Sequence, residues 1–408
     1  MRIGRTLPPA AAPIYLKDIF CAIKSLLHSR RELERFKSEI KNCFHVPDCF
    51  LFSSGKAALA LALLALKQLT PGKDEVIVPA YVCYSVPSAV VRAGLKVVPC
   101  DLKPNSLEMN QDILPSLLSQ ATLCVIVPHL FGLPAAVSEI RKLCREKRIL
   151  VLEDAAQTIG IKYNGKMLGT QGDIGFFSLG RGKSFSTVEG GILITNETPI
   201  ARLFQQKLSE IDSYTFVEKV VLLIKAILIW IFSRPSLYWL PKALPFLKLG
   251  DTIYDPDFPL KKMSSIQAGL ARNWMEKVQG FNAKRVQNAL LYKERIQARA
   301  SVSFFPTDNE MPVCLRLPLF AGKLEEKAKI VYESQKKGLG VMFTYPDSID
   351  GIPQLGNILA PGAYPEAKRL SQHILTLPVH PFMTKQDIDK VVNLFEVCGT
   401  KNVPWKTD

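Results

Sequence analysis

The fold is decided by residues 149–195, which read ILVLEDAAQTIGIKYNGKMLGTQGDIGFFSLGRGKSFSTVEGGILIT. The first apolar run of this stretch, 149–152, ends in two acids, Glu153 and Asp154. A short apolar run bounded by polar residues predicts a buried parallel strand. Ligands bind at the carboxyl ends of strands in open α/β sheets, so we expect Asp154 to point into a site.

A second predicted strand, 173–179, leads into a glycine-rich loop that carries Lys183. A lysine held near a cofactor in such a loop can have a lowered pKa, which frees its amine to react. Residues 189–191 (EGG) then turn the chain into a further apolar strand, 192–195. This arrangement suits pyridoxal phosphate, which needs a lysine for a Schiff base and a carboxylate to keep its pyridine nitrogen protonated.

The residues alone leave a plainer interpretation open. An Asp after a strand often caps a helix, and a lysine in a glycine loop is often a solvated turn residue. The stretch resembles the DegT/DnrJ/StrS-type sugar aminotransferases, pyridoxal-phosphate enzymes of fold type I, in EDAAQ at 153–157, GDxGxFS at 172–178 and Kx5EGG at 183–191. The resemblance implies an α/β fold with a large domain, whose mostly parallel central sheet is flanked by helices, and a smaller α+β C-terminal domain.

A turn before an apolar helix is the second candidate for a functional segment. Residues 50–66 (FLFSSGKAALALALLAL) predict a strand, a turn containing Ser54 and Gly55, and a helix. Free N–H groups and the positive end of the dipole make a helix N-terminus a seat for phosphate, although Ser54 also suits an ordinary N-cap. In the family a similar turn lies under the cofactor phosphate. Lys56 stands where the family usually has threonine, and it could bind phosphate as a point charge.

The resemblance also implies roles for the other candidate residues. Lys183 would hold the cofactor and move the proton, and Asp154 would keep the ring nitrogen protonated. Ser178 would join the Ser54-Gly55 turn in holding phosphate, and Gln157 would contact the ring. The family places an aromatic residue on the ring where this sequence has Cys83, so either this thiol packs against the ring, or Tyr84 stacks on it, or Cys83 is a core residue without ligand contact.

Composition limits the remaining possibilities. A chain of 408 residues suits two domains or one large α/β domain with an extension. Nine scattered cysteines without a CxxC pair favour reduced thiols in the cytoplasm, and five histidines without ligand spacing, His129 among them, favour local hydrogen bonding over a metal site. The net charge of +15 suits a phosphorylated substrate or an anionic membrane better than nucleic acid, since no nucleic-acid-binding motif accompanies it. The proline-rich N-terminal arm lacks the apolar core of a signal peptide.

The resemblance, together with the change of hydrophobic pattern along the chain, implies three parts: a large cofactor-binding domain with the arm (1–212), an apolar insert (213–258) and a small C-terminal domain (259–408). A helix is expected at 17–41, and parallel strands joined by helices are expected through 195. One or two long helices are expected within 259–296. Strands are then expected at 312–318 and 340–344, and a last helix at 385–397.

The insert does not follow the family pattern. Residues 220–232 (VVLLIKAILIWIF) are apolar except Lys225, but they are too few to span a membrane. Three interpretations of 214–249 stay open: a foot that lies on a membrane surface, a cover buried against a partner subunit, or a pair of core helices. An Asn-Tyr-Arg-Met segment of the family, whose asparagine reaches the phosphate of a neighbouring subunit, aligns with LKKM at 260–263, so that contact is unsupported here.

The resemblance implies an aminotransferase that moves an amino group from an amino acid, glutamate or glutamine, to a keto sugar. We expect a nucleotide-linked sugar, a role in surface polysaccharide or amino-sugar synthesis, a homodimer, and a cytoplasmic location that can be peripheral to the membrane. Two alternatives stay open: a membrane-associated scaffold without turnover, and a pyridoxal-phosphate enzyme acting on a lipid-linked or non-sugar ketone. A dehydratase branch of the family has histidine in place of the lysine, and Lys183 argues against it.

Overall fold

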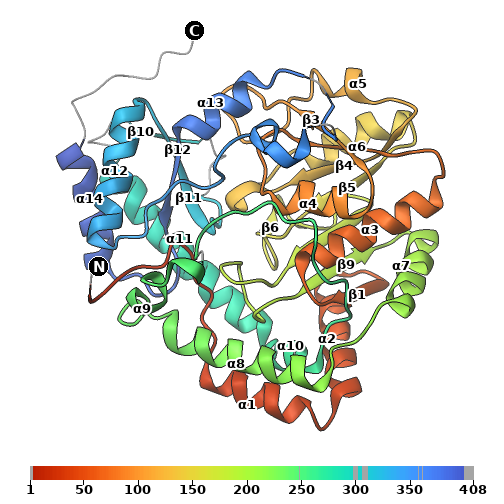
Figure 1. Cartoon of the computed structure of the whole chain (residues 1–408), viewed down its shortest axis with the longest axis horizontal. Helices are drawn as coiled ribbons and strands as arrows, with labels where there is room; N and C mark the ends of the chain where they lie inside the picture. Colours follow the sequence, from red (N-terminus) through yellow and green to blue (C-terminus); the bar gives the residue numbers. More distant parts are fainter. Residues whose placement is uncertain are drawn as a thin grey trace.

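The computed structural model describes residues 3–247, 249–296, 302–305, 311–356, 358–360 and 362–398; residue 248 of the insert therefore lies outside the described residues. A seven-stranded sheet and a three-stranded sheet lie beside each other, each covered by helices (Figure 1). The larger sheet belongs to the N-terminal half of the chain and the smaller one to the C-terminal part. This arrangement confirms the predicted α/β class.

The large sheet has the strand order β1-β9-β8-β5-β4-β2-β3. Neighbouring strands from β3 to β8 are parallel, and β9 is antiparallel to both β8 and β1. Apolar runs form these strands because both faces of the sheet are covered. The strands are β1 (Asp48–Phe52), β2 (Glu75–Pro79), β3 (Lys96–Cys100), β4 (Thr122–Pro128), β5 (Leu150–Asp154), β8 (Ile174–Ser178) and β9 (Gly191–Thr195).

Alternate residues of each strand enter different cores. In β4, Cys124 and Ile126 belong to the core under α3, while Val125 and Val127 belong to the core under α6. Two layers of helices therefore enclose the sheet. One layer contains α3 (Gly55–Leu69), α4 (Ser85–Arg92) and α7 (Thr198–Glu210); the other contains α2 (Ser29–Phe44), α5 (Leu114–Leu117), α6 (Val137–Glu146), α10 (Ser265–Leu270) and the start of α11 (Trp274–Ile296).

The expected single helix at 17–41 is two helices, α1 (Leu16–Ser25) and α2. Their apolar faces enter different cores: α1 packs with α8 and α10, whereas α2 packs against β1 and Trp274. One straight helix could not bury both faces. The break after Ser25 is therefore a product of packing.

The small sheet is antiparallel and consists of β10 (Val302–Phe304), β11 (Arg316–Ala321) and β12 (Ile374–Pro378). Its core is shared with the end of α11 and with α14 (Lys385–Cys398), and α12 (Leu324–Lys337) and α13 (Pro365–His373) pack beside it. Leu7 of the N-terminal arm is buried in the same core. The expected strand at 340–344 is wrong, because that segment makes only one isolated bridge, Met342 with Thr376.

The insert forms α8 (Phe216–Phe232), α9 (Trp239–Lys242) and the 3₁₀ turn η2 (Pro245–Leu247). Among the described residues, no helix combines the length and apolarity needed to cross a bilayer. The minor elements are β6 (Lys162–Tyr163) paired with β7 (Lys166–Met167), η1 (Leu130–Gly132), η3 (Ile349–Gly351) and η4 (Pro353–Leu355).

Candidate active site

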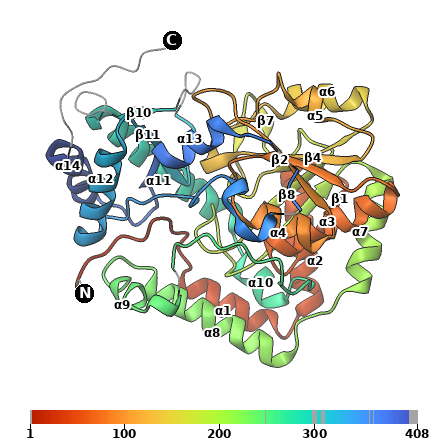
Figure 2. The same cartoon turned by 45° about the horizontal axis from the view of Figure 1, so that its top comes forward.

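One edge of the large sheet gathers the candidate residues. Asp154 ends β5, Ser178 ends β8, and the Ser54-Gly55 turn follows β1. Register confirms that these strand ends share one edge, because Ser178 pairs with Gly191, and Gly191 also pairs with Phe52. In the turned view, the small domain lies beside the large one (Figure 2).

Asp154 and Lys183 lie close enough to interact electrostatically. Asp154 is buried, and its Oδ1 accepts a hydrogen bond from the amide of Ala156 at 2.9 Å. Burial raises the pKa of Asp154, while that hydrogen bond and the charge of Lys183 act in the opposite direction. The Lys183 ammonium has no hydrogen bond or ion pair within the described part of the chain. A buried carboxyl and an unpaired amine thus meet at the strand edge.

A small cradle joins the start of α3 to the end of β8. The Ser54 side chain accepts a hydrogen bond from the amide of Ala57 at 3.1 Å, which makes it the N-cap of α3. A Cβ on Gly55 would lie 2.7 Å from Ser178 Oγ, so only glycine lets this hydroxyl approach the helix end. The amides of Gly55 and Lys56 have no partner among the described residues. Two free amides and one hydroxyl at a helix N-terminus form an anion site.

The side chain of Lys56 points to other partners. Its Nζ lies 2.8 Å from Asp255 Oδ2 and 4.6 Å from the ring centroid of Phe258. Because Asp255 already balances this charge, Lys56 would reach a phosphate through its backbone amide. The LKKM segment that replaces the family's Asn-Tyr-Arg-Met lies nearby, since the carbonyl of Lys261 accepts a hydrogen bond from the amide of Ser53 at 2.9 Å.

Aromatic residues of both domains meet above the sheet edge. Tyr345 is buried, stacks on Phe131 at 5.8 Å, and lies 5.3 Å from Tyr81 between ring centroids. Nearby charges that act on its pKa include Cys83 and Asp154, although burial is the main reason that this pKa is raised. Tyr345 is a residue of the site to which the sequence assigned no role.

Tyr84 joins the start of α4 to the loop that contains Asp347. Its hydroxyl accepts a hydrogen bond from the amide of Asp347 at 3.0 Å and donates to the carbonyl of the same residue at 3.2 Å. Cys83 is half-buried, and its Sγ accepts a hydrogen bond from the Ser85 hydroxyl at 3.1 Å. The structure therefore places Cys83 beside Tyr345 and gives the hydroxyl of Tyr84 a defined partner away from the sheet.

The loop that carries Lys183 is held by hydrogen bonds with Gln157 and Arg285. Ser184 donates a hydrogen bond to the carbonyl of Gln157 at 2.9 Å, and Gln157 Nε2 donates to the Tyr345 hydroxyl at 3.4 Å. From α11, Arg285 donates to the carbonyls of Lys183 and Ser184 at 3.3 and 3.0 Å. Arg285 is fully buried, and burial lowers its pKa to about 9. It is a positioning residue for Lys183 that the sequence did not reveal.

Glu153 organises the loop on the other side of Asp154. It accepts hydrogen bonds from the amides of Gly169, Gln171 and Gly172 at 2.5–2.9 Å, and it lies 2.8 Å from Nε2 of His129. The amide of Ala135 donates to His129 Nδ1, so Nε2 carries the proton that Glu153 accepts. Burial raises the pKa of Glu153, but these hydrogen bonds outweigh burial and the net pKa is lowered. The local hydrogen-bonding role predicted for His129 is thus confirmed.

Arg316 on β11 brings a cation from the small domain to the aromatic cluster. Its Nε and one terminal nitrogen are buried and have no hydrogen-bond partner among the described residues. Burial lowers its pKa to about 10, while the neighbouring Tyr345 and Tyr81 act in the opposite direction. An unpaired buried guanidinium favours an anionic ligand. No sequence pattern predicted a role for Arg316, since nothing in the residues of β11 shows what that strand end faces.

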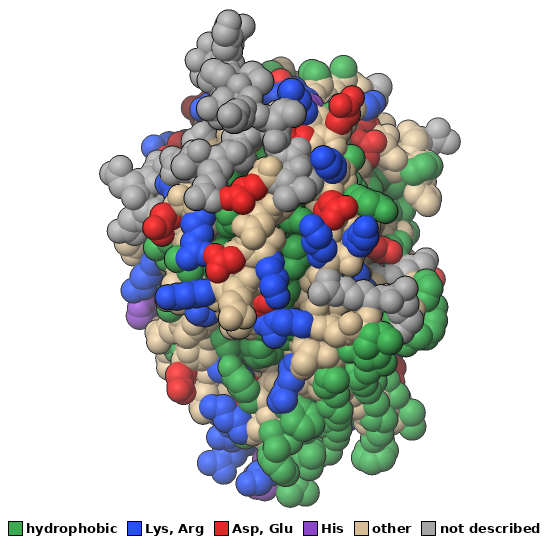
Figure 3. All heavy atoms as spheres, turned by 90° about the vertical axis from the view of Figure 1, so that its left-hand side faces the viewer, with side chains coloured by type: hydrophobic (Ala, Val, Ile, Leu, Met, Phe, Trp, Pro, Cys, Tyr) green, Lys and Arg blue, Asp and Glu red, His purple; other side chains and the backbone are tan. Residues whose placement is uncertain are grey.

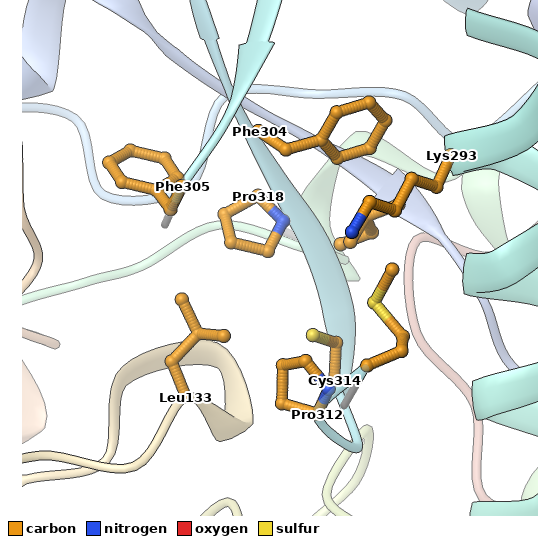
Figure 4. A pocket seen from close by; sticks show the side chains of 9 residues that line it. Leu133, Lys293, Phe304, Phe305, Pro312, Cys314 and Pro318 are labelled. Atoms are coloured by element: carbon orange, nitrogen blue, oxygen red, sulfur yellow. The ribbon is translucent and has the colours of Figure 1, made fainter. Parts of the chain in front are cut away.

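An apolar hollow lies near the domain junction but contains none of the candidate residues (Figure 4). Side chains of Leu133, Phe304, Phe305 and Pro318 surround it, and the amine of Lys293 points into it. It offers no carboxylate and no helix N-terminus. We therefore place the candidate site at the sheet edge and not in this hollow.

The sheet-edge residues fit pyridoxal phosphate. The cradle of Gly55 and Ser178 suits its phosphate, and Asp154, whose second oxygen has no partner among the described residues, suits its ring nitrogen. Lys183 supplies the unpaired amine.

Comparison with known proteins points to one family. The DegT/DnrJ/EryC1/StrS aminotransferase family matches residues 21–210 and 260–396. The chain is 32% identical over 183 residues to the GDP-perosamine synthase of Vibrio cholerae, a match covering 45% of this chain and 49% of that protein. It is 23% identical over 367 residues to the erythromycin biosynthesis sensory transduction protein EryC1 of Saccharopolyspora erythraea, with 88% of each covered.

A solved structure shows the same fold. PseC of Helicobacter pylori, an aminotransferase involved in the biosynthesis of pseudoaminic acid, superposes with a TM-score of 0.77 at 16% identity, covering 96% of this chain and 100% of that one. The matched segment spans about half the length of the first curated relatives. Between its two matched segments the family match omits 211–259, which contains the whole of the insert.

Proposed function

Because this chain belongs to the DegT/DnrJ/EryC1/StrS aminotransferase family, we propose that it is a pyridoxal-phosphate enzyme that moves an amino group from an amino acid to a keto sugar. The observation that carries this proposal is the meeting of Lys183 and Asp154 at one strand edge, next to the Gly55–Ser178 cradle. A lysine, a buried carboxylate and an anion site are the three groups that this cofactor needs.

The residues divide the work as follows. When bound, the cofactor supplies an electron sink, because its protonated ring nitrogen withdraws electrons from the carbon that loses a proton. Asp154 holds the proton on that nitrogen, and burial keeps its carboxyl away from competing water. The amides of Gly55 and Lys56 and the hydroxyl of Ser178 bind the phosphate.

Lys183 acts as the proton carrier. Lys183 would hold the cofactor, and its Nζ would be the base that removes the proton from Cα of the amino-acid donor. Arg285 keeps the Lys183 loop in place through the carbonyls of Lys183 and Ser184. Gln157 and Tyr345, which are joined by a hydrogen bond, would orient the cofactor ring.

The finer parts of the proposal concern substrates and assembly. A nucleotide-linked keto sugar is supported by the relative named GDP-perosamine synthase and by the net charge of +15. Glutamate or glutamine as donor and a homodimer rest on the family resemblance. A peripheral position on the cytoplasmic face of a membrane is supported by the exposed apolar residues of the insert.

The test combines colour with turnover. Purified protein given pyridoxal phosphate should show a visible absorption band, and Lys183→Ala should abolish that band while leaving the circular-dichroism spectrum unchanged. A panel of nucleotide-linked keto sugars with glutamate, read by mass spectrometry, should yield an aminated product.

Two outcomes would contradict the proposal. A protein that stays colourless with added cofactor favours the scaffold without turnover. A coloured protein that deaminates glutamate but aminates no sugar favours a different ketone as acceptor.

A further inference from the structure

Helix α8 is apolar on two faces. Leu222 and Ala226 are buried in a core shared with α1 and α10. On the other side, residues at positions i, i+4, i+7 and i+11 are exposed: Val217, Val221, Ile224 and Leu228. No described part of the chain covers this outward stripe. A helix that is a core helix on one face therefore presents a second apolar face to its surroundings.

Helix α1 and the turn after it repeat the pattern. Leu16, Phe20, Ile23 and Leu27 have the same spacing, and all are exposed, Leu27 by 81%. The two helices pack against each other and lie side by side at the lower edge of the molecule in both views (Figures 1 and 2). We call the two outward stripes together the two-helix face. Exposed apolar side chains at Leu240, Leu244 and Phe246 continue it onto α9 and η2.

The two-helix face is held in place. Thr215 and Glu218 form a capping box at the start of α8. Two ion pairs fasten the helix to the body, Glu218 with Lys261 at 2.5 Å and Lys225 with Glu189 at 3.0 Å. A preformed apolar face binds a surface with little loss of conformational entropy.

The border of the two-helix face is cationic. Lys17, Lys24, Arg30 and Arg31 are exposed on or just after α1, and Arg234 and Lys242 are exposed near the end of α8 and on α9. The acids of α1 and α8 are neutralised, because Asp18 is buried beside Lys277 and Glu218 pairs with Lys261. In the space-filling view a hydrophobic patch fills the lower end of the molecule, with Lys and Arg side chains beside it (Figure 3).

We propose that the two-helix face docks on the surface of a membrane containing anionic phospholipids. The apolar stripes enter the boundary between headgroups and acyl chains, and the cationic border contacts the anionic headgroups. A second copy of the chain suits the face less well, because a two-fold contact would bring the two cationic borders together. The inference deepens the membrane contact proposed above, and it rests on that contact and not on turnover.

The test measures vesicle binding by the full-length protein. Wild-type protein should sediment with vesicles of phosphatidylcholine and phosphatidylglycerol, bind weakly to phosphatidylcholine alone, and release at high salt. The variant Val217→Ser/Ile224→Ser/Leu228→Ser should bind the anionic vesicles at least about tenfold more weakly, because it loses three exposed aliphatic side chains that docking would bury in the membrane. A matched control, Leu69→Ser/Leu324→Ser/Tyr332→Ser, removes exposed apolar side chains from α3 and α12 and should bind like the wild type.

Light scattering and turnover on a soluble sugar nucleotide accompany each binding measurement. If the outward-stripe variant becomes monomeric while the wild type is dimeric and ignores vesicles, the face is a subunit contact and the lipid proposal is wrong. Equal vesicle binding by wild type and variant would also overturn it. Lack of turnover in a wild-type protein that binds vesicles would instead refute the proposed enzyme activity alone.

Discussion

At the scale of single residues, the site depends on how burial changes ordinary side chains. Asp154 is a carboxyl held among apolar residues beside one amine, and its pKa is raised by that burial. Its neighbour Glu153 is also buried, yet its pKa is lowered because amides and His129 hydrogen-bond to it. Two adjacent acids therefore have different tasks. Glu153 holds a loop through its hydrogen bonds. The second carboxylate oxygen of Asp154 has no hydrogen-bond partner among the described residues, so it can bind a ligand.

Asp154→Asn should stabilise the cofactor-free protein at neutral pH. The folded-state pKa is raised, so the ionised carboxyl destabilises the fold increasingly as the pH rises above the unfolded-state pKa of about 3.9. The variant should melt at a higher temperature than the wild type near pH 7, and the difference should shrink as the pH falls and vanish below about pH 4, where the carboxyl becomes protonated in both states. Circular dichroism of both proteins across this range measures it.

The same substitution that raises the melting temperature should lower the enzymatic activity. Asp154→Asn should lower kcat by at least about a hundredfold, since an amide does not keep the ring nitrogen protonated. Asp257→Asn, at an exposed carboxyl, is the control and should change neither melting nor kcat. A variant less stable than the wild type at neutral pH would contradict the structural assignment of Asp154 as a buried carboxyl whose pKa is raised.

At the scale of elements, the junction of β1, α3 and β8 forms the phosphate cradle. The N-cap of Ser54 fixes where α3 begins, and the absence of a side chain at Gly55 lets Ser178 approach. The sequence predicts the turn and the helix, because Ser-Ser-Gly before a small-residue run is a strong local signal. It does not predict the contact of Gly55 with Ser178, which depends on β9 pairing between β1 and β8.

Gly55→Ala should weaken cofactor binding. The new Cβ would lie 2.7 Å from Ser178 Oγ, so the hydroxyl must move out of the cradle. We expect the Kd for pyridoxal phosphate, titrated by absorbance, to rise about tenfold or more. The control is Gly280→Ala in α11, which meets open space and should stabilise the protein by about 0.5–1 kcal/mol without changing the Kd. An unchanged Kd for Gly55→Ala would place the phosphate elsewhere.

At the scale of the whole molecule, the site is completed where the two domains meet. The amide of Leu315, just before β11, donates a hydrogen bond to the carbonyl of Phe131 at 2.9 Å, and Tyr84 binds Asp347. A Cβ on Gly132 would lie 2.2 Å from the carbonyl oxygen of Val313, so the segments fit only without a side chain there. This junction brings Arg316 and Tyr345 to the edge that carries Asp154.

Arg316→Met should raise KM for an anionic substrate by about tenfold or more while changing kcat less, because an unpaired buried guanidinium suits an anion. Separate titrations of the amino acid and the sugar nucleotide show which substrate it binds. Arg202→Met on α7, at an exposed position, is the control and should leave both constants unchanged. If Arg316→Met alters neither KM, its charge serves the fold and not a ligand.

The sequence by itself determined the strands of the large sheet, the small-residue turn before α3, and the pairing of an acid at a strand end with a lysine in a glycine loop. These features are local, since a continuous apolar run buries both faces of a strand and a glycine permits its own turn. The roles assigned to Lys183 and Asp154 stay predictions until the spectra and variants test them.

Only the tertiary structure decided which distant segments meet. Packing between elements far apart in the chain decides four features that the sequence did not show. These are the break between α1 and α2, the absence of a strand at 340–344, the contact of Arg285 with the Lys183 loop, and the position of Arg316 near Tyr345. Periodicity tells which face of a helix is apolar but not what covers it. For that reason the helical spacing of the apolar residues in α8 is visible in the sequence, whereas their exposure is visible only in the tertiary structure.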